Sequence, residues 1–208
     1  MKTALIVDDY PLIRMAVSIL LEREGFQNII EVDNGVDAIQ QVREQLPDLV
    51  ILDISIPKFD GLEVIMRLSA LSLRLKIVVL SSQPASLYST RCMQAGAAGY
   101  VCKTGDLGEL VNAIRAVMSG YHYFPNLAFN SVRRSDAQAS ELDLLNRLSD
   151  REMSVLRQLA LGKSNKEVGV DMALSNKTIS TYKIRVMNKL NIGTLVELAD
   201  IAKRNALA

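Results

Sequence analysis

The first 119 residues of the chain repeat one pattern, and this pattern restricts the fold more than any other feature of the sequence. A short aliphatic run is followed by turn residues and then by a stretch whose apolar positions recur with the period of an α-helix. Consecutive βα units of this kind form a parallel sheet that is covered by helices on both faces. We therefore predict an α/β domain of the doubly wound (βα)5 type over residues 1–119, with strands at Ala4–Val7, Asn28–Glu31, Leu49–Leu52, Ile77–Leu80 and Gly99–Cys102, and helices at Leu12–Arg23, Gly35–Gln45, Gly61–Ser69, Ala85–Ala95 and Leu107–Met118.

Polar side chains follow four of these five predicted strands directly. Asp8 and Asp9 follow the first strand, and Asp53 follows the third. Ser81 comes after the fourth strand and Lys103 after the fifth. Ligands of open parallel sheets bind outside the carboxyl ends of the strands, so we expect these side chains to meet at one site.

Three carboxylates at one site require a cation. Asp8, Asp9 and Asp53 would raise one another's pKa values by repulsion unless a divalent ion lies between them. Mg²⁺ prefers oxygen ligands and leaves room for waters and phosphate oxygens, so this set of residues is typical of phosphoryl transfer. Together, Mg²⁺ and Lys103 would bring the formal charge of the site from about −3 to about 0, which allows a phosphoryl group to enter.

Asp53 is the predicted nucleophile of this site, because a carboxylate can form an acyl phosphate. Ser81 and Lys103 are expected to bind the phosphoryl oxygens. A pull on Ser81 would move the loop after the fourth strand, and Tyr100 is expected to rotate into the space left behind. Such a response is a two-state switch that the phosphoryl group biases.

Each of these residues also has a purely structural interpretation. Asp9, which lies just ahead of Pro11, has the pattern of an ordinary helix N-cap. Asp53 taken alone is compatible with a loop residue, Lys103 with a surface lysine and Tyr100 with a core aromatic residue. Their joint placement at the strand ends favours the functional interpretation.

The formal charge changes sign along the chain. Residues from Ser149 onward contain 10 Lys+Arg and 6 Asp+Glu, which gives +4, whereas the residues before Ser149 contain 14 and 17, which gives −3. A basic C-terminal part suggests a polyanionic partner such as nucleic acid.

Short helices are predicted for the C-terminal part, and a helix-turn-helix lies among them. Hydrophobic periodicity fades in residues 120–147, which we interpret as an interdomain linker. Residues 148–208 are predicted to form an all-α domain of four helices, two of which, Ser164–Ala173 and Asn176–Leu190, are joined by a tight turn. Its start signals are a capping box at Ser149-Asp150-Arg151-Glu152 and N-caps at Ser164, Ser175 and Thr194, and its stop signals are Gly162 and Gly193.

The helix Asn176–Leu190 has an apolar face and a polar face. Ile179, Val186, Met187 and Leu190 are expected to face the domain core. The opposite face is predicted to enter the major groove of DNA, with flanking side chains on phosphates, although a solvated helix face is the alternative. The predicted DNA-binding residues are Lys177, Thr178, Ser180, Thr181, Lys183, Ile184, Arg185 and Asn188.

An ordered set of motifs extends through the first part of the chain: Ile6-Val7-Asp8-Asp9, Leu52-Asp53-Ile54-Ser55-Ile56-Pro57, Asp60-Gly61, Ser81 and Lys103. These residues resemble the receiver domain of two-component response regulators. The resemblance implies that Asp53 accepts a phosphoryl group and that the backbone carbonyl of Ser55 joins Asp8, Asp9 and Asp53 around Mg²⁺. It also implies that Ser81 and Tyr100 form the switch pair and that Pro57 and Gly61 shape the loop. Tyr10 departs from the histidine that is frequent in this subfamily, which bears on the rates of phosphorylation and dephosphorylation.

A second set of motifs lies in the C-terminal part: Leu148–Glu152, Gly162–Glu167 and Leu174–Lys183. It resembles the LuxR-type helix-turn-helix of the NarL/FixJ response regulators, and the chain as a whole is similar to their BvgA/EvgA branch. The resemblance implies promoter DNA as a partner and a hybrid sensor histidine kinase or phosphotransfer domain as the phosphodonor. It further implies a homodimer formed through the last helix, about Thr194–Asn205, with RNA polymerase as a further candidate partner. We expect phosphorylation to control dimerisation and promoter binding.

Two other functions remain open from the sequence. One is a Mg²⁺-dependent phosphatase with an aspartate nucleophile, and the other is a phosphate-independent receiver that serves only to dimerise the DNA-binding part. No nucleotide-binding or hydrolase motif occurs, so we expect a regulator and not an enzyme, apart from slow autodephosphorylation. The short apolar run at the N-terminus and the lack of any membrane-length apolar segment predict a cytoplasmic protein. The operator, the signal, the cognate kinase and the sign of regulation are not encoded in any recognisable motif.

Overall fold

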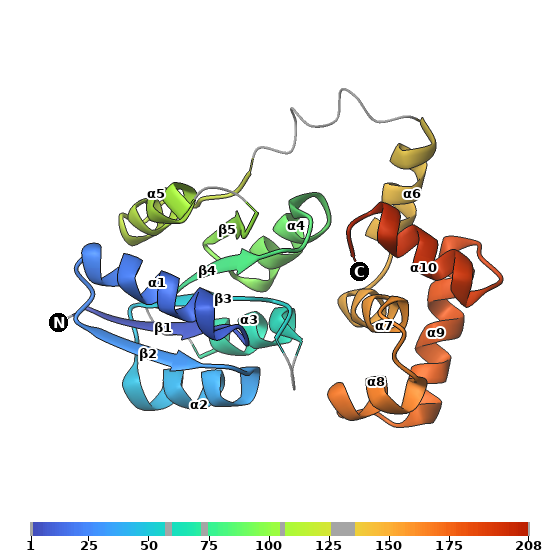
Figure 1. The fold of residues 1–208 in the computed structure, drawn as a ribbon, viewed down its shortest axis with the longest axis horizontal. Coiled ribbons are helices and arrows are strands. Elements are labelled where there is room, and N and C mark those ends of the chain that lie inside the picture. The colour runs from blue at the N-terminus through green and yellow to red at the C-terminus, as the bar shows by residue number, and fades with distance from the viewer. Residues whose placement is uncertain (1, 57–59, 72–74, 105–106, 126–135, 208) are drawn as a thin grey trace. The chain divides into compact units, whose positions relative to one another are not determined.

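The computed structural model of the protein describes residues 2–56, 60–71, 75–104, 107–125 and 136–207. The chain divides into two compact units, Met1–Pro125 and Asn126–Ala208 (Figure 1). No described helix combines the length and the apolar character that crossing a membrane would require.

The first unit is built around a parallel sheet. Its strands are ordered β2-β1-β3-β4-β5, so the sequence order reverses beside β1, as in doubly wound folds. This confirms the predicted fold class. The described strands are β1 (Thr3–Val7), β2 (Asn28–Val32), β3 (Leu49–Leu52), β4 (Lys76–Ser81) and β5 (Gly99–Cys102), and the helices that alternate with them are α1 (Pro11–Arg23), α2 (Gly35–Gln45), α3 (Gly61–Ser69), α4 (Ala85–Ala95) and α5 (Leu107–Met118).

Helices cover both faces of this sheet. Side chains of α1 and α5 pack in one cluster with alternate residues of the strands, for example Ile6, Ile51 and Val78. Helix α3 contacts α2 and α4, and these two helices contact the strands β1 and β5 respectively. Because both faces are covered, the central strand β3 reads as an unbroken aliphatic run, Leu49–Leu52, and all four of its residues are buried.

Local signals explain where the first helices begin. Pro11 occupies the first turn of α1, where its missing N–H leaves no hydrogen bond unmade. Tyr10 is the N-cap residue of α1 and makes no side-chain capping bond, so the interpretation of Asp9 as an N-cap is wrong. Asn34 and Asp60 cap α2 and α3 by accepting backbone N–H bonds.

The second unit is helical, and its predicted start signals are confirmed. Capping boxes begin α7, α8 and α10 at Ser149, Ser164 and Thr194, and the Ser175 side chain caps α9. One stop signal is different, because α9 ends at Leu190 and its C-cap is Asn191, which adopts the left-handed conformation at φ 55°, and not Gly193. The helices of this unit are α6 (Asp136–Asn146), α7 (Asp150–Ala160), α8 (Asn165–Asp171), α9 (Asn176–Leu190) and α10 (Leu195–Arg204).

The region expected to be an irregular linker contains ordered elements at both ends. Tyr123 forms an isolated parallel bridge with Gly99 at the edge strand β5, and its ring packs against the core of the first unit. Helix α6 occupies residues 136–146 of the same region. Leu145 of α6 is buried, and Glu141 bonds to Arg204 and Asn205 at the end of α10. Helix α6 is therefore part of the C-terminal unit.

Candidate functional site

The carboxyl ends of β1, β3, β4 and β5 lie side by side, because these strands are neighbours in the sheet. The register pairs Val7 with Leu52 and Ser81 with Cys102, so the residues that follow these pairs reach the same edge. Asp53 is fixed there by a backbone hydrogen bond from its N–H to Val7, and Lys103 by a bond from its N–H to Ser81. The sheet thus gathers the predicted site residues of four separate segments.

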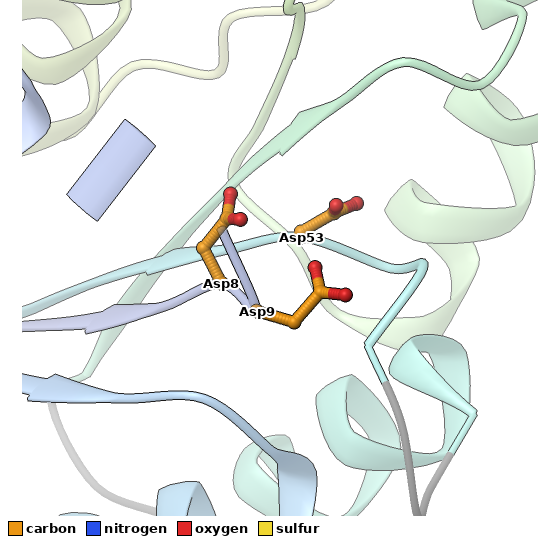
Figure 2. Close-up of side chains that lie close together, drawn as sticks. All are labelled: Asp8, Asp9 and Asp53. Atoms are coloured by element: carbon orange, nitrogen blue, oxygen red, sulfur yellow. The ribbon is translucent and has the colours of Figure 1, made fainter. Parts of the chain in front are cut away.

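Three carboxylates form a cluster at this edge (Figure 2). Asp8, Asp9 and Asp53 each offer one oxygen, and these oxygens lie within 4.8 Å of one another. Asp8 and Asp53 are buried, whereas Asp9 is exposed. An all-oxygen donor set with one solvent-facing member suits Mg²⁺, which retains several waters when bound. The donor set therefore fits the metal that the sequence predicts.

Lys103 is the cation that balances the two buried carboxylates. Its ammonium lies 2.6 Å from Asp8 Oδ2 and 2.7 Å from Asp53 Oδ2, and its side chain is 10% exposed. Burial by itself would lower the pKa of Lys103, but Asp53 and Asp8 outweigh burial, and the pKa lies above the ordinary lysine value. Burial raises the pKa of the Asp8 carboxyl in spite of the bond from Lys103. The two buried carboxylates are thus paired with one buried ammonium, and a phosphoryl group or a metal ion that binds here can rearrange these pairs.

Two donors hold the other oxygen of the Asp53 carboxylate. The hydroxyl of Ser81 donates to Asp53 Oδ1 at 2.8 Å, and the backbone N–H of Ser55 donates to the same atom at 2.9 Å. Ser81 is completely buried. With Lys103 on Oδ2, the carboxylate of Asp53 is held in one orientation by three groups.

Tyr100 lies inside the protein beside the loop that follows β4. Its side chain is 0% exposed, and its hydroxyl donates to the backbone carbonyl of Gln83 at 2.7 Å. Burial raises the pKa of Tyr100 above its ordinary value, so the hydroxyl remains a donor throughout the physiological range. The ring that is expected to rotate inward on phosphorylation is therefore already in the inward position in this structure.

Sequence reasoning missed two residues that support the pocket. Arg14 donates from Nη1 to the backbone carbonyl of Asp8 at 2.8 Å and pairs through Nε with Glu31 at 3.2 Å, which ties the β1–α1 turn to β2. Gln83 bonds to both Ser55 and Ser81. Gln83 follows a predicted strand end, which is a weak signal, whereas Arg14 gives no signal because its partners come from outside its own helix.

Gly61 and Tyr10 lie close to the pocket. A Cβ atom on Gly61 would lie 2.3 Å from the Cα of Ile54, so only glycine allows α3 to start this close to the loop after Asp53. Pro57, the other residue expected to shape this loop, lies outside the described residues. The ring of Tyr10 is 63% exposed and lies 5.8 Å from the Lys103 ammonium.

The predicted helix-turn-helix consists of α8, a turn and α9. Helix α8 ends at Asp171, earlier than predicted, and Ala173 in the turn has a positive φ of 53°. A Cβ on Gly169 would lie 2.7 Å from the carbonyl oxygen of Leu174, so glycine allows the turn to fold back on α8. Asn165 on α8 donates to the Ser180 hydroxyl on α9 at 3.1 Å, which fixes the two helices to each other.

The two faces of α9 differ in burial. Ile179, Val186 and Leu190 are buried, while Met187 is only partly buried. The predicted DNA-contacting residues are not all equally available: Ser180 is engaged by Asn165, and Thr178 is paired with the N-cap Ser175. Lys183, Thr178 and Ser180 are partly buried, and the predicted contact residues that are exposed are Lys177, Thr181, Ile184, Arg185 and Asn188.

A parallel (βα)5 sheet with an Asp–Lys pocket, followed by a helical unit with a helix-turn-helix, is the architecture of a receiver domain joined to a DNA-binding domain. Residues 4–115 match the family described as the response regulator receiver domain, and residues 146–202 match that described as bacterial regulatory proteins, luxR family. The chain belongs to the LuxR-type two-component response regulators, which are transcriptional regulators.

Several known proteins resemble the chain over its full length. The virulence-factor transcription regulator BvgA of Bordetella pertussis is 53% identical over 98% of both chains. The DNA-binding transcriptional activator EvgA of Escherichia coli K12 is 36% identical, again over 98% of both. The structure of RcsB from Salmonella enterica serovar Typhimurium, bound to the rprA promoter, has the same fold, with a TM-score of 0.74, 24% identity and coverage of 98% of this chain and 99% of that one. The first two similarities agree with the predicted branch of the family.

Proposed function

We propose that Asp53 is the phosphoacceptor of this response regulator. The observation that carries the proposal is the convergence of Asp8, Asp9, Asp53 and Lys103 at one edge of the sheet, with oxygens of the three carboxylates within 4.8 Å of one another. Asp8, Asp9, Asp53 and the backbone carbonyl of Ser55 would hold Mg²⁺, which when bound neutralises charge on the transferring phosphoryl group.

The chain's own groups prepare Asp53 for the reaction. A carboxylate oxygen of Asp53 forms a bond to phosphorus as the P–N bond of a phosphohistidine breaks, and the donor imidazole retains the bonding electron pair. The Lys103 ammonium and the Ser81 hydroxyl, which bind the carboxylate at 2.7 and 2.8 Å, are placed to exchange it for phosphoryl oxygens. Ser81 and Tyr100 then act as the switch, since both border the loop after β4. The phosphodonor is a sensor histidine kinase or phosphotransfer domain, of the hybrid kind by similarity to the BvgA/EvgA branch.

The C-terminal unit binds promoter DNA through α9. The exposed, basic face of this helix supports the assignment, with Thr181 and Ile184 facing base edges and Lys177, Arg185 and Asn188 facing base edges and phosphates. Phosphorylation promotes a homodimer through α10, and the regulator acts in the cytoplasm, with RNA polymerase as a further partner. EvgA is described as a transcriptional activator, which favours positive regulation by the present chain as well.

The test is the binding of the protein to fragmented genomic DNA at fixed salt, with and without a small-molecule phosphodonor and Mg²⁺. Asp53→Asn removes the nucleophile, and the matched control Asp48→Asn changes an exposed aspartate at the opposite end of β3 while retaining the oxygen that accepts from Thr3. Tighter, site-selective binding after phosphorylation of wild type and D48N, but not of D53N, supports the proposal. Equal binding by all three proteins would favour the phosphate-independent receiver, and phosphate release without DNA binding would favour the phosphatase.

A further inference from the structure

Gln83 is the residue through which the phosphoacceptor and the buried tyrosine are connected. It lies in the loop between β4 and α4, two residues after Ser81. Its backbone N–H donates to Ser81 Oγ at 3.4 Å, and its side-chain Nε2 donates to Ser55 Oγ at 3.3 Å. Its backbone carbonyl accepts the hydroxyl of Tyr100 at 2.7 Å.

The two serines that Gln83 contacts are the two residues that bind the same oxygen of Asp53. Ser81 donates to Asp53 Oδ1 through its hydroxyl, and Ser55 donates to it through its backbone N–H. A change at that oxygen therefore reaches Gln83 along two routes, one from β4 and one from the loop after β3. The carbonyl of Gln83, which accepts the Tyr100 hydroxyl, passes the resulting displacement to the Tyr100 side chain, which is completely buried.

The side-chain carboxamide of Gln83 is incompletely satisfied in this conformation. Its Oε1 atom is shielded from solvent and accepts no hydrogen bond from any residue that the structure describes. A buried acceptor without a donor disfavours the conformation that contains it. The loop therefore has a physical reason to rearrange when the groups on Asp53 Oδ1 are redirected.

We propose that Gln83 is a positioning residue of the switch: by anchoring the loop after β4 to Ser55, its side chain makes the surroundings of the buried Tyr100, including its hydrogen bond to the Gln83 carbonyl, respond to the phosphorylation of Asp53. This inference rests on the proposed function of Asp53 and deepens it. Without the bond between Gln83 and Ser55, Asp53 still accepts a phosphoryl group, but the loop after β4 no longer moves in response.

The experiment follows phosphorylation and the tyrosine separately in the full-length protein. 3-Fluorotyrosine replaces the 6 tyrosines, the variant Tyr100→Phe assigns the ¹⁹F resonance of Tyr100, and acetyl phosphate with Mg²⁺ is the phosphodonor. Intact-mass spectrometry gives the phosphorylated fraction, and the readout is the Tyr100 shift per phosphorylated molecule. The variants are Gln83→Met, Gln83→Glu, Ser55→Ala and the double variant Ser55→Ala/Gln83→Met, with Ser82→Ala at the exposed neighbouring position as the matched control.

We expect S82A to behave like wild type. In Q83M the Tyr100 shift per phosphorylated molecule should fall roughly twofold or more. S55A should show a similar decrease, and the double variant should show little more than either single variant. Q83E retains the size of the side chain and presents oxygens to which the Ser55 hydroxyl can donate, so it should retain more of the shift than Q83M. A wild-type shift in Q83M or in S55A, or additive losses in the double variant, would overturn the proposal. Failure of the wild type to gain a phosphoryl mass would instead contradict the function assigned to Asp53.

Discussion

Replacing Lys103 with methionine tests whether the pocket is a balanced set of buried charges. The substitution keeps an unbranched chain of similar length but removes the ammonium that lies 2.6 Å from Asp8 and 2.7 Å from Asp53. Leaving a buried ion without its partner costs about 3–5 kcal/mol, and we take the lower end, about 3 kcal/mol, because Asp8 can be protonated. The expected result is a large loss of receiver stability near neutral pH without divalent metal.

The size of this loss can be converted into a melting temperature. An unfolding entropy of about 2.1 cal/mol/K per residue, applied to the unit Met1–Pro125, gives about 0.26 kcal/mol/K, so that 3 kcal/mol corresponds to a decrease of about 11 °C. Because the pKa of Lys103 is raised in the folded state, its contribution to the stability of the receiver is complete below the ordinary lysine pKa, and hence at pH 7. This contribution is lost only as the pH rises through the folded-state pKa. The assay is differential scanning calorimetry of the receiver transition.

Two conditions should restore the stability of the variant. Mg²⁺ at about 100 times its Kd adds about 2.7 kcal/mol to a folded state that binds it, and the variant should bind it more tightly because Lys103 no longer opposes the metal. Lowering the pH through the raised pKa of Asp8 should also reduce the difference in melting temperature between wild type and the variant, since a protonated carboxyl needs no cation.

The matched control is Lys76→Met, because Lys76 forms no ion pair with any described residue of the same unit. If K103M melts at the wild-type temperature in metal-free buffer at pH 7, the charge-balance reasoning is wrong.

Three further predictions concern the loop, the C-terminal unit and DNA. Gly61→Ala would place a methyl group 2.3 Å from a backbone carbon, so we expect a loss of about 1–3 kcal/mol in urea unfolding, and an unchanged midpoint would refute the contact. Arg204 lowers the pKa of Glu141, so wild type should have a higher free energy of unfolding than Glu141→Gln at neutral pH, by less than about 1 kcal/mol. This difference should vanish as the pH falls through the lowered pKa, and a difference independent of pH would contradict the prediction. When the logarithm of the DNA-binding constant is plotted against the logarithm of the salt concentration, Lys183→Ala should reduce the magnitude of the slope by about 0.9. Ile184→Ala should leave the slope unchanged but alter the sequence preference, and the reverse result would exchange the contacts assigned to the two residues.

The strands and most helices followed from short-range patterns. The aliphatic run Leu49–Leu52 and the caps at Ser149, Ser164 and Thr194 act over a few residues, so each is visible in the sequence without knowledge of the rest of the chain. Asn191 shows the limit of this approach. It stops α9 in the left-handed conformation although a glycine lies two residues later, because asparagine also tolerates positive φ.

Helix α6 was not predicted, because its stability depends on partners far away in the sequence. Its apolar residues lack the clear periodicity that marks an amphipathic helix, and Glu141 finds Arg204 and Asn205 only once α10 has folded beside it. Leu145 is buried for the same reason.

The sequence by itself determined the fold class and the acidic residues of the pocket, since the alternation of strands and helices follows from local periodicity and the residues at the strand ends share the carboxyl edge of a parallel sheet. Only the tertiary structure decided how these groups are connected. The bonds of Arg14 to the β1–α1 turn and of Gln83 to Ser55 and Tyr100 join separate segments at single atoms. A hydrogen bond depends on positions within a few tenths of an ångström, and the packing of the whole unit sets those positions.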